Sequence, residues 1–167
     1  MKDDSIFELS PQDKTAIDTW LAQYPADQKR SALIPALHIA QKANGGWLSE
    51  AAMKAVAVYL DLPQIQVFEV ATFYSMFELA PVGKHTLCVC TNVSCLLSGS
   101  DEIVSHLKKR LRIDFNETTE NQQFTLKEVE CLGACVEAPV LRVDEAFHTH
   151  LTPEKIDALL AELEKKG

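Results

Sequence analysis

The first half of the chain carries apolar residues at helical spacing, in segments separated by proline and glycine. Ser10 and Pro11 are the residue types favoured at a helix N-cap and at the first helical position. The apolar stripes predict helices over residues 11–24, from about Gln28 or Ser31 to Ala43, and over residues 50–62 and 65–72. Segments of this length with one apolar face pack together, so we expect a small helical bundle over residues 1–82.

The pattern changes after Pro81-Val82-Gly83, where short β-type runs begin. Strands are predicted over residues 85–90, from Phe124 to the second cysteine pair, and over residues 140–143 and 147–150. Helices are predicted from a cap at Ser98 or Ser100 to Leu111, and over residues 153–163. Residues 114–121 are polar and acidic, which predicts an exposed loop. The order β-α-β-β-β-α predicts an α/β sandwich over residues 83–167, so the fold class is α+β.

Two cysteine pairs follow predicted strands in this second half. Cys90 and Cys95 are separated by four residues, and Cys131 and Cys135 by three. Thiolates are soft ligands that suit iron–sulfur clusters or zinc, and four of them complete a tetrahedral shell. The spacing therefore predicts a four-thiolate metal site, and it leaves iron and zinc both open. A fifth cysteine, Cys88, precedes the first pair and is expected to be a buried bystander.

Composition limits the classes of partner. The net charge is −8, which disfavours nucleic acid and anionic lipid because both require a basic surface. No apolar run approaches the ~20 residues that span a bilayer. The N-terminal residues resemble neither a secretory signal nor a transit peptide. We therefore expect a cytoplasmic protein, in which thiols stay reduced and paired cysteines bind metal rather than form disulfides.

Several segments resemble one known family, the thioredoxin-like [2Fe–2S] subunit of NADH:quinone oxidoreductase, respiratory complex I. The first half carries the segments 32–37, 40–41, 44–48 and 69–77, and the second half carries the four cysteines with 124–126, 128–135 and 138–139. Two independent regions thus agree in the same order, over most of the chain from about Pro11 onward.

The resemblance implies a fold, a cofactor and a setting. It implies a thioredoxin-like second domain in which Cys90, Cys95, Cys131 and Cys135 hold one [2Fe–2S] cluster, with no catalytic residue on this chain. FMN and NADH would lie on a partner subunit, which the helical bundle would help to dock. Other peripheral-arm subunits would be further partners. The chain would lie on the peripheral arm of a membrane-bound complex, without inserting into the membrane, at the cytoplasmic face of the inner membrane in a bacterium.

Within such a complex we expect an electron-transfer subunit without turnover of its own, exchanging single electrons with the flavin. The equivalent subunit of an NAD-linked hydrogenase or formate dehydrogenase stays open. From the residues alone, a zinc-stabilised adaptor is the main rival. A thiol oxidoreductase is disfavoured because neither pair has the Cys-x-x-Cys spacing. Glu130 and Glu137 flank the second pair and are expected to lower the reduction potential by Coulomb repulsion.

Overall fold

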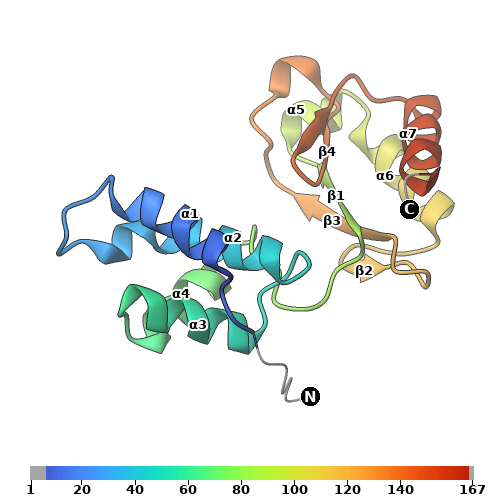
Figure 1. Cartoon of the computed structure of the whole chain (residues 1–167). Helices are drawn as coiled ribbons and strands as arrows, with labels where there is room; N and C mark the ends of the chain where they lie inside the picture. The colour runs from blue at the N-terminus through green and yellow to red at the C-terminus, as the bar shows by residue number, and fades with distance from the viewer. Residues whose placement is uncertain (1–6, 166–167) are drawn as a thin grey trace. The chain divides into compact units, whose positions relative to one another are not determined.

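The computed structural model describes residues 7–165, which divide into two compact units between Pro81 and Val82. The first unit is helical, and the second contains a five-stranded sheet with helices (Figure 1). Each unit has its own apolar core. The α+β class predicted from the sequence is confirmed.

The helical unit is built from successive helices that pack in chain order (Figure 1). The helices are α1 (Pro11–Leu21), the 3₁₀ turn η1 (Lys29–Ala32), α2 (Leu33–Ala43), α3 (Glu50–Leu60) and α4 (Gln64–Phe73). Ser10 caps α1 with a capping box to Asp13, and the hydroxyl of Ser49 accepts a hydrogen bond from the N–H of Ala52 to cap α3. These caps satisfy N–H groups that have no partner inside the helix.

The core of the helical unit lies between the inner faces of these helices. Ile17, Leu37 and Leu60 are each fully buried in it, from three different helices. Gln41 of α2 connects this core to the segment after α4, since its side-chain amide donates to the carbonyl of Met76 at 3.3 Å and accepts from the N–H of Glu78 at 2.8 Å. A hydrogen-bonded side-chain amide therefore holds the end of the unit against α2.

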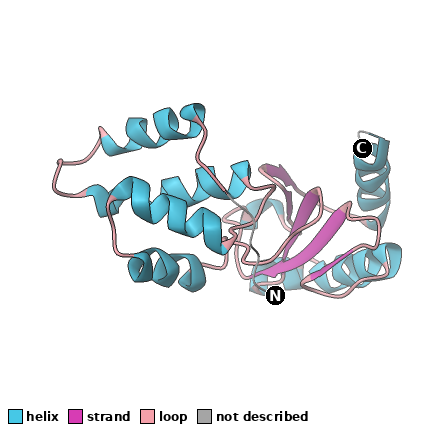
Figure 2. Cartoon of the chain, turned by 60° about the horizontal axis from the view of Figure 1, so that its bottom comes forward, coloured by secondary structure: helices cyan, strands magenta, loops and turns pink. Residues whose placement is uncertain are grey.

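The sheet unit has strand order β2-β3-β1-β4-β5, in which β1 and β3 are parallel and the other neighbours are antiparallel (Figure 2). The strands are β1 (His85–Cys90), β2 (Glu117–Thr118), β3 (Phe124–Val129), β4 (Leu141–Val143) and β5 (Ala146–His148). The helices are α5 (Val93–Leu97), α6 (Ser100–Leu111), η2 (Cys135–Glu137) and α7 (Pro153–Lys165). The register pairs Cys90 with Val129 at the ends of the two parallel strands.

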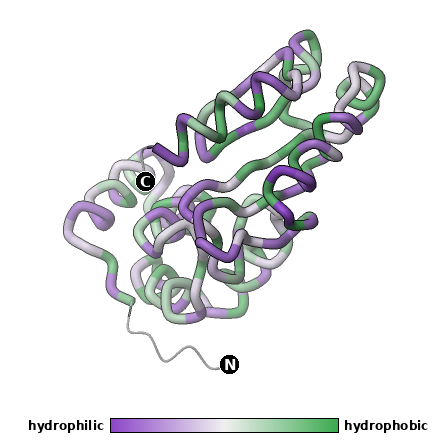
Figure 3. The backbone as a smooth tube through the Cα atoms, turned by 90° about the vertical axis from the view of Figure 1, so that its right-hand side faces the viewer, coloured by the Kyte–Doolittle hydropathy of each residue, from purple (hydrophilic) through white to green (hydrophobic). Residues whose placement is uncertain are grey.

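Helices α6 and α7 bury their apolar stripes against one face of this sheet. The buried set combines helix residues with alternate strand residues: Ile103, Leu107, Leu111, Ile156, Leu160, Leu87, Val89, Phe124, Leu126, Leu141 and Val143. Figure 3 shows the corresponding alternation of hydrophobic and hydrophilic residues along the helical segments. Alternation along a strand directs every second side chain to the same face, which is why these strand positions share one core.

Gly83 fits closely against the start of β3. A Cβ at this position would lie 2.9 Å from the backbone of Phe124. The N–H of Gly83 donates to the buried hydroxyl of Thr125 at 2.6 Å. Only glycine allows the backbone to approach this closely.

Three local features differ from the sequence prediction. The loop predicted over 114–121 contains the two-residue strand β2, which exists because it pairs with β3. The strand predicted over 147–150 begins at Ala146 and ends at His148, and His150 has a φ of 48°. The segment after Cys90 forms the short helix α5, which contains Cys95 and which the periodicity did not predict.

Candidate metal centre

Both cysteine pairs leave the sheet from the same edge. Strands β1 and β3 are parallel neighbours, so their carboxyl ends lie together, and each is followed by a segment that carries cysteines. Thr91 continues the ladder beyond β1, with its N–H donating to the carbonyl of Val129 at 3.2 Å. The topology thus brings two segments that are far apart in sequence to one edge of the sheet.

The first pair is buried. Cys90 is the last residue of β1 and Cys95 lies in α5, with exposed fractions of 3% and 2%, and both contact the buried side chain of Val140. Asn92 caps α5, because its side-chain oxygen accepts from the N–H of Val93 at 2.7 Å. Burial raises the pKa of the Cys95 thiol, and a hydrogen bond with the Cys90 thiol raises it further. The two thiols of this pair are therefore in contact, and Cys95 favours its neutral state.

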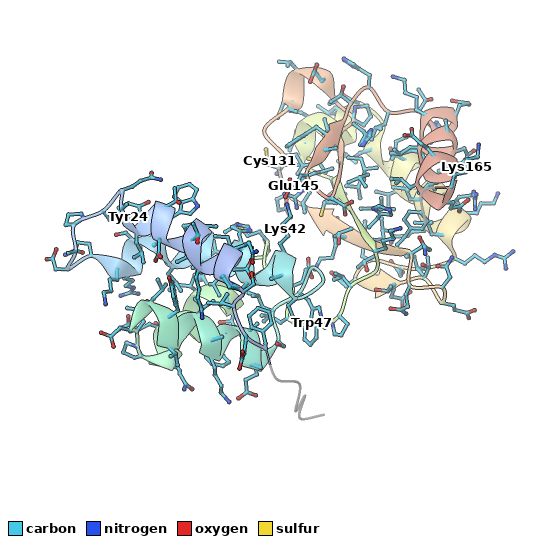
Figure 4. All side chains as sticks on the ribbon, viewed as in Figure 1. Tyr24, Lys42, Trp47, Cys131, Glu145 and Lys165 are labelled. Atoms are coloured by element: carbon cyan, nitrogen blue, oxygen red, sulfur yellow. The ribbon has the colours of Figure 1, made fainter. Side chains whose placement is uncertain are left out.

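The second pair is exposed. Cys131 follows the end of β3, and Cys135 opens the short turn η2. Gly133 lies between them with φ of 74°, a conformation that favours glycine, and its N–H donates to Sγ of Cys131 at 3.4 Å. Figure 4 labels Cys131 on this segment. Backbone N–H donors of this kind also stabilise the negative charge on a metal-bound sulfur.

All four of these cysteines carry free thiols, and so does Cys88. Cys135 lies close enough to Cys95 for their charges to interact, while Cys131 contacts its own loop. Over residues 7–165, no three His, Cys, Asp or Glu side chains are gathered tightly enough to hold a metal ion. The structure therefore brings the thiols of Cys90 and Cys95 into contact and places Cys135 near Cys95. The donor set itself, four free thiols on two adjacent segments, fits an iron–sulfur cluster or zinc.

Cys88 lies in the middle of β1 and is buried. Its Sγ accepts a hydrogen bond from Nη2 of Arg142 at 3.5 Å, on the neighbouring strand β4. Its described side-chain hydrogen bond therefore lies within the sheet.

Two acidic residues near the edge connect the segments, and one of them, Glu128, was not singled out from the sequence. The Thr91 hydroxyl donates to Oε1 of Glu128 at 2.8 Å, and Nδ2 of Asn92 donates to Oε2 of Glu130 at 3.3 Å. The Cys90 thiol donates to the carbonyl of Glu130 at 3.4 Å. Glu128 could have been found only from the register that places the end of β3 beside Thr91.

Exposed apolar side chains lie on the two segments that follow these strands, at Val93, Leu96 and Leu97 of α5 and Val136 of η2, and we call these four residues the apolar collar. Their exposed fractions run from 52% for Leu96 to 94% for Val136. Lysine and arginine are absent from the segments 88–101 and 128–141, which contain Glu128, Glu130 and Glu137. The edge that carries the cysteines is therefore apolar with an acidic border.

Comparison with known proteins places this arrangement in a class. The chain belongs to the thioredoxin-like [2Fe–2S] ferredoxin family, whose model matches residues 17–164. The resemblance predicted from the sequence is confirmed.

Among curated proteins, the chain is similar to the E subunit of NADH-quinone oxidoreductase from several bacteria. It is 44% identical over 157 residues to the protein from Rickettsia bellii (strain RML369-C), covering 94% of both chains. It is 49% identical over 142 residues to that from Rickettsia felis (strain ATCC VR-1525 / URRWXCal2), covering 85% of both chains. It is also 41% identical over 157 residues to the mitochondrial NADH dehydrogenase (ubiquinone) flavoprotein 2 of Dictyostelium discoideum, covering 94% of this chain and 64% of that one.

Among solved structures, the fold resembles a chain of an NAD⁺-reducing [NiFe]-hydrogenase in the air-oxidized state. The TM-score is 0.69 at 21% sequence identity, over 80% of this chain and 23% of that chain. At this level of identity the likeness concerns the fold. Separately, no helix within residues 7–165 has the length and apolar character needed to cross a membrane.

Proposed function

We propose that this chain is the electron-transfer subunit of an NADH:quinone oxidoreductase, with no turnover of its own. The observation that carries the proposal is the similarity to the E subunit of that complex over most of both chains, at 44–49% identity. The two free-thiol pairs at one edge of the sheet support it independently. FMN and NADH belong to a partner subunit, and this chain exchanges single electrons with that flavin.

We propose Cys90, Cys95, Cys131 and Cys135 as the ligands of one [2Fe–2S] cluster. When bound, such a cluster accepts or returns one electron, and its formal charge changes from roughly −2 to roughly −3. The buried pair supplies two sulfurs from the strand end and α5, and Val140 excludes water on that side. The exposed pair supplies two sulfurs from a segment in which Gly133 offers a backbone N–H to Cys131. N–H donors of this kind offset the added negative charge.

Purification of the full chain without oxygen tests the cofactor. Two irons and two acid-labile sulfides per chain, with an EPR signal after reduction, support the proposal. A colourless protein with one zinc per chain supports a zinc-stabilised adaptor instead. Metal-free protein that cycles reversibly between thiol and disulfide supports a thiol oxidoreductase.

The equivalent subunit of an NAD-linked hydrogenase is the second candidate for the host complex. The hydrogenase likeness favours it only at the level of the fold, whereas the curated similarity extends over most of both chains. Co-purification from the native source decides between them, because quinone-reducing and hydrogenase partners differ in mass and in metal content.

We propose that the apolar collar docks on the flavin subunit and that the chain lies on the peripheral arm, at the cytoplasmic face of the inner membrane in a bacterium. Exposed apolar side chains with an acidic border suit an apolar surface bordered by Lys and Arg. The helical unit offers a second docking candidate, the exposed edge-to-face pair Phe73 and Tyr74.

Binding of the full chain to the flavin subunit tests these surfaces. Leu97→Glu should weaken binding to the flavin subunit if the collar is the docking surface. Phe73→Glu should weaken the same binding if the helical unit contributes a second docking surface. Phe147→Glu changes an exposed apolar residue of β5 outside the collar and serves as the control. Equal binding by all three variants contradicts both docking proposals.

A further inference from the structure

Besides the bond from the Cys90 thiol to the carbonyl of Glu130, two side-chain hydrogen bonds between the cysteine-bearing segments share one arrangement. Each connects a side chain just after Cys90 to a carboxylate just before Cys131. Thr91 reaches Glu128, and Asn92 reaches Glu130, at 2.8 Å and 3.3 Å. We call these two bonds the clasp. They join the two segments through side chains, whereas the strand ladder joins them only through backbone atoms.

Asn92 contributes to the clasp and to α5, because the oxygen and the nitrogen of its side-chain amide both make hydrogen bonds. Its oxygen accepts from the N–H of Val93 and so begins α5, the helix that contains Cys95. Its nitrogen donates to Glu130, the neighbour of Cys131 in the sequence. One side chain therefore connects the helix of the first pair to the residue that precedes the second pair.

We propose that Glu128 and Glu130 are positioning residues that hold the two cysteine pairs in register for the cluster. This inference rests on the proposed function, since it concerns how the chain retains that group. A carboxylate that accepts from a neutral donor makes a stronger bond than a neutral pair, although exposure to solvent reduces its contribution. Glu137 flanks the second pair as well, but its described hydrogen bonds are those of its backbone, since its N–H donates to the carbonyl of Ala134 and its carbonyl accepts from the N–H of His150. It provides a matched carboxylate outside the clasp.

The clasp can be separated from the charge of the carboxylates by an exchange of donor and acceptor. Asn92→Asp keeps the oxygen that caps α5 but replaces the donor that faces Glu130 with a second carboxylate oxygen. Adding Glu130→Gln to that variant restores one donor and one acceptor in the opposite direction. The double variant has the same net charge as the unmodified pair.

The experiment uses the full chain reconstituted with iron and sulfide, and follows cluster absorbance in the presence of an iron chelator. We expect Asn92→Asp, Glu130→Ala and Glu128→Ala each to shorten the half-life about threefold to tenfold, the range expected for one lost hydrogen bond. Glu137→Ala should leave the half-life unchanged. The double variant Asn92→Asp with Glu130→Gln should recover most of the loss of Asn92→Asp. EPR g-values should shift with Asn92→Asp and return in the double variant.

Three results would overturn the inference. In the first, the double variant is as labile as Asn92→Asp alone. In the second, the clasp variants lose iron no faster than Glu137→Ala. In the third, the unmodified protein takes up no iron and sulfide. The last result rejects the proposed function together with the clasp, whereas the first two reject the clasp alone. Thermal unfolding of each metal-free variant separates loss of register from loss of folding.

Discussion

The two cysteine pairs lie at one edge of one sheet, yet their environments differ. Cys90 and Cys95 are buried beside Val140, whereas Cys131 and Cys135 are exposed on a turn. The first pair is therefore part of the fold, and its thiols contribute to packing whether or not a metal is present. The second pair contributes only chemistry. Similar spacings in the sequence thus conceal different structural roles.

The largest effect expected from this difference concerns replacement of the cysteines by serine. Any of the four replacements should destabilise the [2Fe–2S] cluster, because three thiolates would leave one iron a thiolate short and a serine oxygen is a poorer ligand for iron than sulfur. Only Cys90→Ser and Cys95→Ser should also destabilise the metal-free protein, by about 1–3 kcal/mol, since a polar hydroxyl costs more to bury than a thiol. Iron analysis and urea unfolding followed by circular dichroism measure the two effects.

For the exposed pair, Cys131→Ser and Cys135→Ser should change the unfolding free energy by no more than about 0.5 kcal/mol. Equal destabilisation by all four serine variants would show that the two pairs do not differ in this way.

Thiol alkylation of the metal-free protein should reveal the same difference. Iodoacetamide should modify Cys131 and Cys135 at least about tenfold faster than Cys90 and Cys95, since access and thiolate content control the rate. The raised pKa of Cys95 acts in the same direction as its burial. Peptide mass spectrometry over a time course gives the rates, and similar rates at Cys95 and Cys135 would contradict the comparison.

Val140→Ala should make the first pair more like the second. Removing two buried methyl groups should cost about 1–2 kcal/mol and open space beside both thiols. Alkylation of Cys90 and Cys95 should accelerate, while the rates at Cys131 and Cys135 stay the same and serve as an internal control. Uniform acceleration at all four sites would instead indicate global unfolding.

Removing one nearby carboxylate charge should change the cluster less than the substitutions above that alter packing. Glu130→Gln and Glu137→Gln should each raise the reduction midpoint by on the order of 20 mV, the value for one charge at about 8 Å in a water-like dielectric. Redox titration followed by EPR measures the midpoint, and added salt should reduce the difference. A midpoint that falls or stays unchanged in both variants would reject a role for these charges.

Substitutions in the helical unit should have the smallest effect on the cysteines. One contact in this unit has a pH dependence of its own, so the unit serves as a reference for the changes expected at the cysteines. The hydroxyl of Tyr59 on α3 donates to Oδ1 of Asp18 on α1 at 2.7 Å. Partial burial raises its pKa from 10.0 to about 12, and the hydrogen bond to Asp18 and the charge of that carboxylate act in the same direction. The contact therefore stabilises the fold fully below pH 10, and the stabilisation is lost as the pH rises from 10 to 12.

Tyr59→Phe should remove this pH dependence and the phenolate absorbance that Tyr59 contributes at high pH. Alkylation rates of the four cysteines should not change in this variant at neutral pH. Unfolding free energies of the two proteins that decline in parallel as the pH rises through this range would contradict the assignment to Tyr59.

Local signals in the sequence were sufficient for most elements of the fold. Ser10 caps a helix as predicted, and the apolar stripe of α6 packs on the sheet. The elements that the sequence did not predict are short. The helix α5 has five residues and depends on one Asn cap, and β2 has two residues and exists only through its pairing with β3. Neither is long enough to show a period.

The sequence alone determined which residues are candidates for the chemistry, because cysteine spacing and family resemblance are properties of the chain. Only the tertiary structure decided that Cys90 and Cys95 are buried, that Cys131 and Cys135 are exposed, and that Glu128 and Glu130 reach the first segment. The physical reason is that burial and hydrogen bonding across strands depend on the parallel pairing of β1 with β3, which joins residues far apart in sequence.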